Sequence, residues 1–261
     1  MVNSYSGTSH FIPLGSFCRC AYQAKVISEY GGIPEPSSFP FDWTITPFRS
    51  IEMALRGQID FEKVLSREST FIDSEGCITC GHTLVRFAHD LRLKELSNRY
   101  QIDLKPYGEL PSALFETEEF ENARGRFSHT CETLYKKMLQ PRALFIRWVH
   151  LSVRKKEPEL YKELHIGEAP LQLLNTLSEI GCHPSSRLMY VLTETIPGVR
   201  DPFKESPVTR FGSSNSGLFV CHLKERKGSN GNQAPVFYGD SVSWLAAFKE
   251  AFAWFESPNR S

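Results

Sequence analysis

Short apolar runs alternate with amphipathic segments along most of this chain. Runs rich in Val, Leu, Ile and Phe predict buried strands at about 11–14, 143–149, 187–192 and 217–223. Apolar residues spaced by three and four predict helices at about 17–28, 47–55, 117–140, 158–180 (interrupted) and 240–255. Buried strands that alternate with helices are typical of an α/β fold with a mainly parallel sheet and helices on both faces.

Other segments carry weaker patterns. Residues 84–87 alternate as a strand does, whereas 97–115 contains prolines and a glycine that favour a long connection. We expect a polar loop from about 197 to 216 and another from 227 to 235. Because no shift in composition marks a boundary, we predict a single domain over 1–261, with flexible tails at 1–10 and 257–261.

Composition excludes some classes of partner. The 30 basic and 30 acidic side chains cancel, so no overall field attracts the chain to nucleic acid or to an anionic membrane. No apolar stretch approaches the roughly 20 residues of a membrane-spanning helix. The first residues are neither basic nor apolar, and the seven cysteines are odd in number. These features predict a cytoplasmic protein with reduced thiols.

Cys18 is the first candidate for chemistry. It follows a predicted strand and a Gly-Ser turn, in the first turn of a predicted helix. Unpaired backbone N–H groups and the positive end of the helix dipole stabilise a thiolate there, and the same N–H groups can bind an oxyanion. A buried structural cysteine fits the same pattern. Cys20 lies on another face of the helix, and we expect it to be a packing residue.

A histidine and three carboxylates could complete such a site. His89 follows the predicted strand at 84–87 and could act as a general base for Cys18. Its neighbour Asp90 could orient the imidazole, although adjacent residues on an extended chain point in opposite directions. Asp42, in an aromatic loop, and Asp240, before the last helix, are further candidates. A surface His-Asp pair, a capped turn and a helix N-cap are the structural alternatives.

Metal and cofactor signatures are weak. Cys77, Cys80 and His82 resemble half of a zinc site, but the chain holds no second paired motif. A redox pair or a hairpin turn with two packed thiols are the alternatives. The motifs G-x-G-x-x-G, Walker A, H-E-x-x-H and G-x-S-x-G are missing. We therefore predict neither a metal nor a cofactor.

Several sequence blocks, in order, carry a resemblance to a known family. They are L-G-S-F-C-R-C-A-Y-Q at 14–23, P-F-D-W at 40–43, H-D at 89–90, L-F-I-R at 144–147 and G-D-S-V-S-W at 239–244. Together they resemble a largely microbial domain family of unknown function that is described as papain-like cysteine peptidase. The first two blocks are the most specific, and the resemblance spans nearly the whole chain.

This resemblance implies a site. It implies Cys18 as the nucleophile, His89 as its base, and Asp42, Asp90 or Asp240 as the orienting acid. Where the family pattern leads us to expect a basic run, this chain has F-S-H-T-C, so His129 becomes a second histidine candidate. The family description also implies an α+β papain-like fold with an antiparallel barrel, as an alternative to the parallel sheet.

The leading functional hypothesis is a cysteine-dependent hydrolase or transferase acting on an amide, ester or isopeptide. Its partner would be a protein, peptide or small-molecule substrate, with no nucleic acid and no membrane. The main alternative is a Rossmann-like protein or transferase that binds a nucleotide or sugar, with a phosphate at the turn before Cys18. A non-enzymatic interaction domain is the third possibility.

Overall fold

A computed structural model describes most of the chain. The described residues are 8–15, 18–31, 37–42, 44–151, 168–196, 208–211, 217–226 and 241–256. Cys18 is described as part of a helix, and Trp43 and Asp240 lie outside these ranges.

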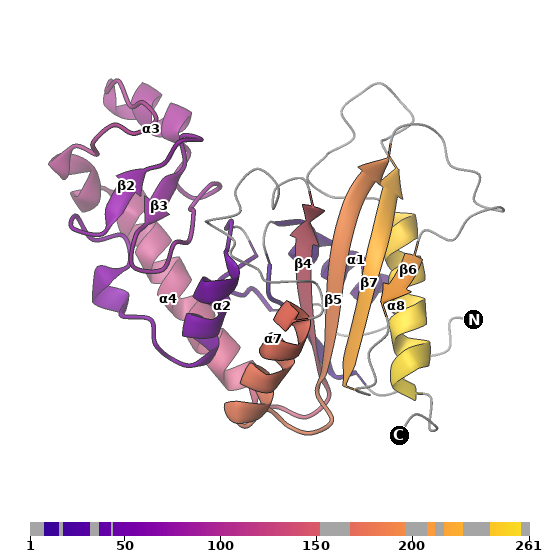
Figure 1. Cartoon of the computed structure of the whole chain (residues 1–261). Helices are drawn as coiled ribbons and strands as arrows, with labels where there is room; N and C mark the ends of the chain where they lie inside the picture. Colours follow the sequence, from indigo (N-terminus) through magenta and orange to yellow (C-terminus); the bar gives the residue numbers. More distant parts are fainter. Residues whose placement is uncertain are drawn as a thin grey trace.

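A five-stranded sheet forms the centre of the fold (Figure 1). Its strands, in spatial order, are β1 (His10–Pro13), β4 (Ala143–His150), β5 (Arg187–Ile196), β7 (Leu218–Arg226) and β6 (Val208–Phe211). The first four strands are parallel, and β6 is antiparallel to β7. The predicted α/β class with a mainly parallel sheet is therefore confirmed, and the antiparallel barrel implied by the family description is not what this sheet shows.

The described part of the chain also contains six α-helices. They are α1 (Cys18–Gly31), α2 (Phe48–Leu55), α3 (Leu93–Tyr100), α4 (Glu118–Met138), α7 (Glu168–Glu179) and α8 (Ser241–Glu256). The longest, α4, has three glutamates in its first turn and two lysines in its last turn, which complement the helix dipole. None of the described helices is long and apolar enough to cross a membrane.

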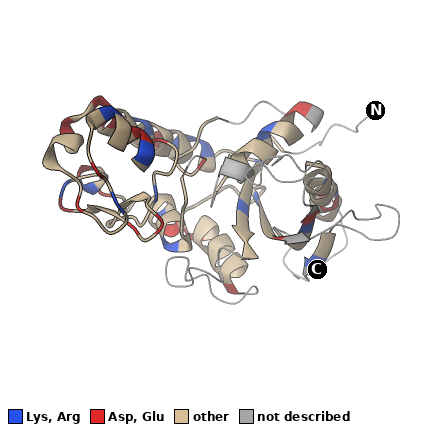
Figure 2. Cartoon of the chain, turned by 90° about the horizontal axis from the view of Figure 1, so that it is seen from above, with Lys and Arg blue, Asp and Glu red and all other residues tan. Residues whose placement is uncertain are grey.

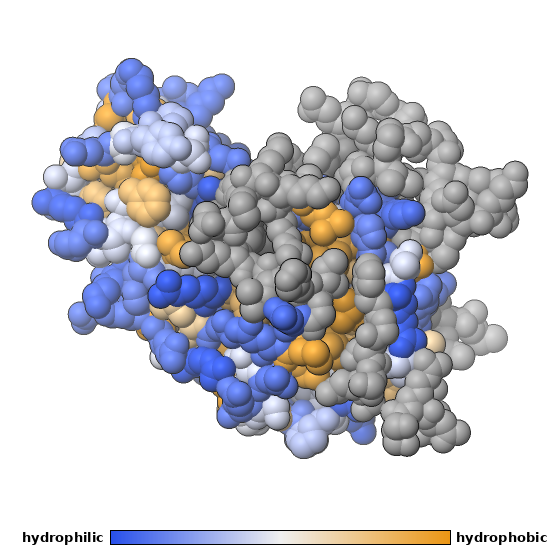
Figure 3. Space-filling model, viewed as in Figure 1, coloured by the Kyte–Doolittle hydropathy of each residue, from blue (hydrophilic) through white to orange (hydrophobic). Residues whose placement is uncertain are grey.

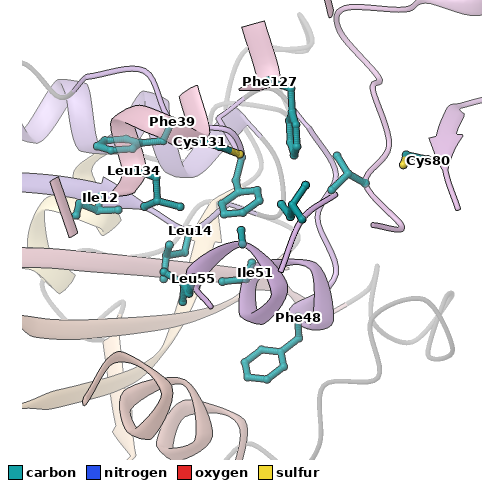
Figure 4. Close-up of a cluster of buried hydrophobic side chains, with 14 of the residues drawn as sticks. Ile12, Leu14, Phe39, Phe48, Ile51, Leu55, Cys80, Phe127, Cys131 and Leu134 are labelled. Atoms are coloured by element: carbon teal, nitrogen blue, oxygen red, sulfur yellow. The ribbon is translucent and has the colours of Figure 1, made fainter. Parts of the chain in front are cut away.

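Alternate residues of β4 contribute to two different hydrophobic clusters. Phe145 and Val149 belong to a cluster with side chains from α2, α4 and α7, part of which is shown in Figure 4. Ile146 and Trp148 belong to a second cluster with side chains from α1 and α8. The strand is buried on both sides, which explains why its sequence is a continuous apolar run rather than an alternating one.

A small β-ribbon lies at the far side of the fold from α8 (Figure 1). It consists of β2 (Thr70–Ile72) and β3 (Ile78–Cys80), which are antiparallel. Arg86 forms isolated bridges to both Thr79 and Ile45, so the ribbon is joined to the segment that follows the P-F-D-W block. The buried ion pair between Arg86 and Asp73, with Nε and Oδ2 2.5 Å apart, fixes this junction.

Some local predictions were wrong. Residues 84–87 form no strand and contribute only the bridges of Arg86. The expected connection over 97–115 contains the end of α3 and a short 3-10 helix, Ser112–Glu116, and another 3-10 helix spans Phe61–Lys63. The strand β6 lies in the expected polar loop, because pairing with the edge of β7 stabilises a segment with little apolar pattern of its own.

Other predictions concern the ends and the surface. The first strand begins at His10, and residues 1–7 and 257–261 lie outside the described part, as do 158–167 and the loop at 227–235. Basic and acidic residues are interspersed along the described helices and loops (Figure 2). Hydrophilic residues cover most of the described surface around β2, β3 and α3 in Figure 3. This distribution agrees with a formal net charge of zero.

Candidate functional site

The turn between β1 and α1 places Cys18 at the carboxyl end of the first parallel strand. The Leu14 N–H donates to the Ile146 carbonyl at 2.7 Å, which extends the pairing of β1 with β4 by one residue. Gly15 follows with a φ of +35°, and α1 begins at Cys18. Ligands of open α/β sheets bind at this edge, and the first turn of a helix offers unpaired backbone N–H groups.

The P-F-D-W block packs directly on this turn. A Cβ atom at Gly15 would lie 2.5 Å from the Phe41 carbonyl oxygen and 3.0 Å from the Phe41 Cβ. Both the left-handed backbone conformation and this close approach require a glycine. The block at 14–23 and the P-F-D-W block therefore pack against each other. Gly15 has no side chain, and the Phe41 carbonyl occupies the space that a side chain would need.

Arg147 joins the same segments from the neighbouring strand. Its side chain is fully buried, and its Nη1 donates to the carbonyls of Leu14 at 3.0 Å and Thr46 at 3.3 Å, and also to the carbonyl of Gly15. A guanidinium stays protonated at all ordinary pH values and offers several donors in a fixed geometry. These hydrogen bonds connect Leu14 and Gly15 to Thr46 of the 39–46 loop. The guanidinium is also a permanent positive charge in the interior.

Asp42 is buried beside this turn. Its side chain is 5% exposed, and Oδ2 accepts a hydrogen bond from the Phe39 N–H at 2.8 Å. The other carboxyl oxygen, Oδ1, is buried and has no hydrogen-bond partner among the described residues. Burial raises the pKa of Asp42 to about 8, against the opposing effect of the Phe39 N–H. The carboxyl is therefore protonated at neutral pH, and its visible role is to close the 39–42 turn.

Cys20 faces the interior two residues after Cys18. Its Sγ donates to the Ile146 carbonyl at 3.2 Å, and the side chain is fully buried. Burial strongly raises the pKa of the Cys20 thiol; the nearby Asp42 acts in the same direction and Arg147 in the opposite one. Cys20 is a neutral packing thiol, as its position on the helix predicted.

Asp90 and His129 come together at a cavity of about 560 Å³. The cavity lies between α4, the 37–40 loop, Thr44 and Asp90. Asp90 forms an ion pair with Arg126 of α4, with Oδ1 and Nη1 2.8 Å apart. Phe39 and Pro40 of the 39–42 loop line this cavity, and Phe41 of the same loop contacts Gly15.

His89 is partly buried beside the cavity residue Asp90. Desolvation lowers the pKa of His89, the charge of Arg92 lowers it further, and Asp90 raises it. The imidazole is therefore neutral at neutral pH and able to accept a proton. The carboxylate of Asp90 is engaged by Arg126.

The start of α8 lies beside α1. Asp240 is outside the described residues, but the next residue, Ser241, accepts a hydrogen bond through its Oγ from the Gln23 Nε2 at 3.3 Å. Trp244 is fully buried and its Nε1 donates to the buried Glu225 at 2.8 Å. The G-D-S-V-S-W block therefore contacts the helix that begins at Cys18.

The thiols of the β-ribbon form a separate group. Cys80 ends β3 in the interior, and the His82 Nε2 accepts a hydrogen bond from the Asp60 N–H at 3.1 Å. Within the described ranges, no three His, Cys, Asp or Glu side chains are grouped as metal ligands would be.

In the sequence, Arg147 is visible only as the last residue of the L-F-I-R block at 144–147, and no role was predicted for it. A charged residue inside an otherwise apolar strand was the available signal, because a buried guanidinium must find acceptors.

No family model matches the chain, and neither the curated proteins nor the solved structures contain a match to it.

Proposed function

We propose that this chain is a cysteine-dependent hydrolase or transferase acting on an amide, ester or isopeptide, with Cys18 as its nucleophile. One observation carries the proposal: α1 begins at Cys18, shortly after the carboxyl end of a parallel strand, where Arg147 bonds the carbonyls of Leu14 and Gly15 and Phe41 packs on Gly15. A nucleophile at a helix N-terminus needs a fixed position, and the hydrogen bonds to the carbonyls of Leu14 and Gly15 hold the chain shortly before it. The resemblance of the sequence blocks to a papain-like cysteine peptidase family supports the same assignment.

The proposed reaction follows from the chemistry of a thiolate. Cys18 transfers its proton to His89 and attacks the substrate carbonyl carbon, and backbone N–H groups of the first turn of α1 stabilise the oxyanion. The leaving amine or alcohol takes the proton from His89, and the acyl group remains on sulfur as a thioester. Water then releases the acid in a hydrolase, whereas an acceptor amine or alcohol takes the acyl group in a transferase.

Asp42 and Asp90 lie in different surroundings. A protonated carboxyl cannot stabilise an imidazolium by its charge, which disfavours Asp42 at neutral pH. The ion pair with Arg126 disfavours Asp90. Asp240 lies outside the described residues and stays the third candidate for the orienting acid.

The wider setting belongs to the same proposal. We infer a single domain with helices on both faces of the sheet, supported by the two clusters that alternate along β4. A cytoplasmic location with reduced thiols and a protein, peptide or small-molecule substrate complete it, with no nucleic acid or membrane partner.

The phosphate-binding alternative is less well supported. A glycine in a phosphate-binding turn leaves room for the ligand to approach its backbone. At Gly15 that room is filled by the carbonyl oxygen of Phe41, 2.5 Å from where a Cβ would lie. We therefore assign this glycine to packing of the 39–42 loop.

Alkylation of the thiols tests the proposal. The folded protein is labelled with iodoacetamide between pH 5 and 9, and each cysteine is followed by mass spectrometry. An ordinary thiol of pKa near 8.5 is a few per cent ionised at pH 7, and lowering its pKa by one unit raises that fraction roughly tenfold. We expect Cys18 to react several-fold faster than the half-exposed Cys77 and at a lower pH midpoint.

Matched variants identify the base. His89→Ala should slow the labelling of Cys18, whereas His183→Ala, an exposed histidine on a distant turn, should not. Cys131→Ser, which removes a buried thiol of α4, should leave the rate unchanged. Labelling of Cys18 no faster than that of Cys77, with the same pH midpoint, would refute the nucleophile. A fast Cys18 that responds to His129→Ala instead of His89→Ala would refute His89 alone.

A further inference from the structure

Arg147 lies where it can act on the reactivity of Cys18 as well as on the fold. Its guanidinium bonds the Gly15 carbonyl, three residues before Cys18, and three residues of extended chain span at most about 11 Å. A unit charge at about 10 Å in protein surroundings shifts an ionisation equilibrium by roughly tenfold. The positive charge therefore lies within effective range of the first turn of α1.

We propose that Arg147 is a positioning residue that holds the β1–α1 turn and places a buried positive charge next to the start of α1, where it favours the thiolate of Cys18. This inference rests on the proposed function of Cys18. It assigns to Arg147 a role distinct from that of His89, because Arg147 exchanges no proton and has no need to touch the substrate.

The groups around the turn allow this charge to act. Asp42 is the acidic group beside Cys20, and burial keeps it protonated at neutral pH, so that it does not cancel the charge of Arg147. Cys20 is held neutral by burial, although the charge of Arg147 opposes that effect. The neighbouring thiol on α1 thus already feels the guanidinium in the direction that the proposal requires for Cys18.

The charge and the hydrogen bonds of Arg147 can be separated by substitution. Carbonyls from two chain segments, at 14–15 and at 46, converge on one nitrogen of the side chain. An ammonium group keeps the charge but presents a single donor centre on a flexible stem. An amide keeps a donor without the charge. Arg147→Lys therefore tests the hydrogen-bond geometry while the charge is kept, and Arg147→Gln tests the loss of the charge.

The experiment compares Arg147→Gln and Arg147→Lys with the wild-type chain. Near-ultraviolet circular dichroism and thermal unfolding establish that each variant is folded, and iodoacetamide labelling of Cys18 is measured from pH 5 to 9. The control is Arg124→Gln, because Arg124 of α4 also donates to two backbone carbonyls, those of Leu65 and Phe115, but has no bond to the turn. We expect Arg147→Gln to slow labelling at pH 7 by roughly tenfold, with a higher pH midpoint.

The outcomes separate this inference from the proposed function. Arg147→Lys should label more slowly than wild type and faster than Arg147→Gln, and the Arg124→Gln control should match wild type. A folded Arg147→Gln that labels at the wild-type rate, or equal rates in the two Arg147 variants, would overturn the role of the charge while leaving Cys18 as the nucleophile. If Arg147→Gln does not fold, Arg147→Lys tests the positioning part of the role, because the ammonium keeps the charge but not the hydrogen-bond geometry; slower labelling than wild type supports that part, and a wild-type rate overturns it. A slow Cys18 in the wild-type chain itself would instead refute the proposed function.

Discussion

Replacing Gly15 with alanine should destabilise the fold far more than an ordinary glycine substitution does. The new Cβ would lie 2.5 Å from the Phe41 carbonyl oxygen, a distance that Cβ atoms do not tolerate. The obstacle is backbone, and the hydrogen bond from the Phe39 N–H to Asp42 restrains the loop that would have to move. The φ of +35° adds a second penalty for any residue with a Cβ.

The expected magnitude is the sum of these two effects. A left-handed backbone conformation costs an alanine about 1–2 kcal/mol, and overpacking a well-filled site costs about 1–3 kcal/mol. The free energy of unfolding should therefore fall by about 2–5 kcal/mol. For a chain of this size, that corresponds to a decrease in Tm of roughly 5–15 °C.

Two other glycines provide controls. Gly57 has a φ of +66° but no atom within 4 Å of the position that a Cβ would take, so Gly57→Ala should show the conformational cost alone. Gly125 lies inside α4 with open space around it, and Gly125→Ala should stabilise the helix by up to about 1 kcal/mol. Urea unfolding followed by circular dichroism measures all three. Equal losses in Gly15→Ala and Gly57→Ala, within about 0.5 kcal/mol, would refute the steric role of Phe41.

Two further predictions concern buried ionisable side chains. The pKa of Asp42 is about 8 in the fold, above its unfolded value, so its contribution to stability is complete below about pH 4 and is lost as the pH rises through 8. Between pH 5 and 9 the free energy of unfolding of wild type should therefore decrease relative to that of Asp42→Asn, and parallel pH profiles in urea unfolding would contradict this. Arg86→Met should cost about 3 kcal/mol, because the buried carboxylate of Asp73 loses its positive partner and keeps only the donors of Glu75, Cys77 and Thr79. Arg92→Met, which breaks only the exposed pair with Glu95, should cost at most about 1 kcal/mol, and a similar loss in both variants would show that burial does not matter.

The amino-acid sequence alone determined the main strands and helices. The parallel strands β1, β4, β5 and β7 and the helices α1, α4 and α8 lie close to the predicted ranges. Their periodicity is a local property, because a strand buried on two faces must be apolar at every position and a helix covering a core must be apolar on one side. The start of a helix at Cys18 follows from the same local signals, a strand followed by a glycine turn.

Tertiary structure decided which of these segments meet. The Arg147 guanidinium bonds Leu14 and Thr46, which lie 133 and 101 residues away in the chain. Such contacts depend on how the strands order themselves in the sheet, which no local pattern specifies. The same holds for β6, whose pairing with the edge of β7 outweighs a weak apolar pattern. The candidate carboxylates were visible in the sequence, but only the fold protonates Asp42 through burial and pairs Asp90 with Arg126, because the charge state of an acid depends on neighbours that folding brings to it.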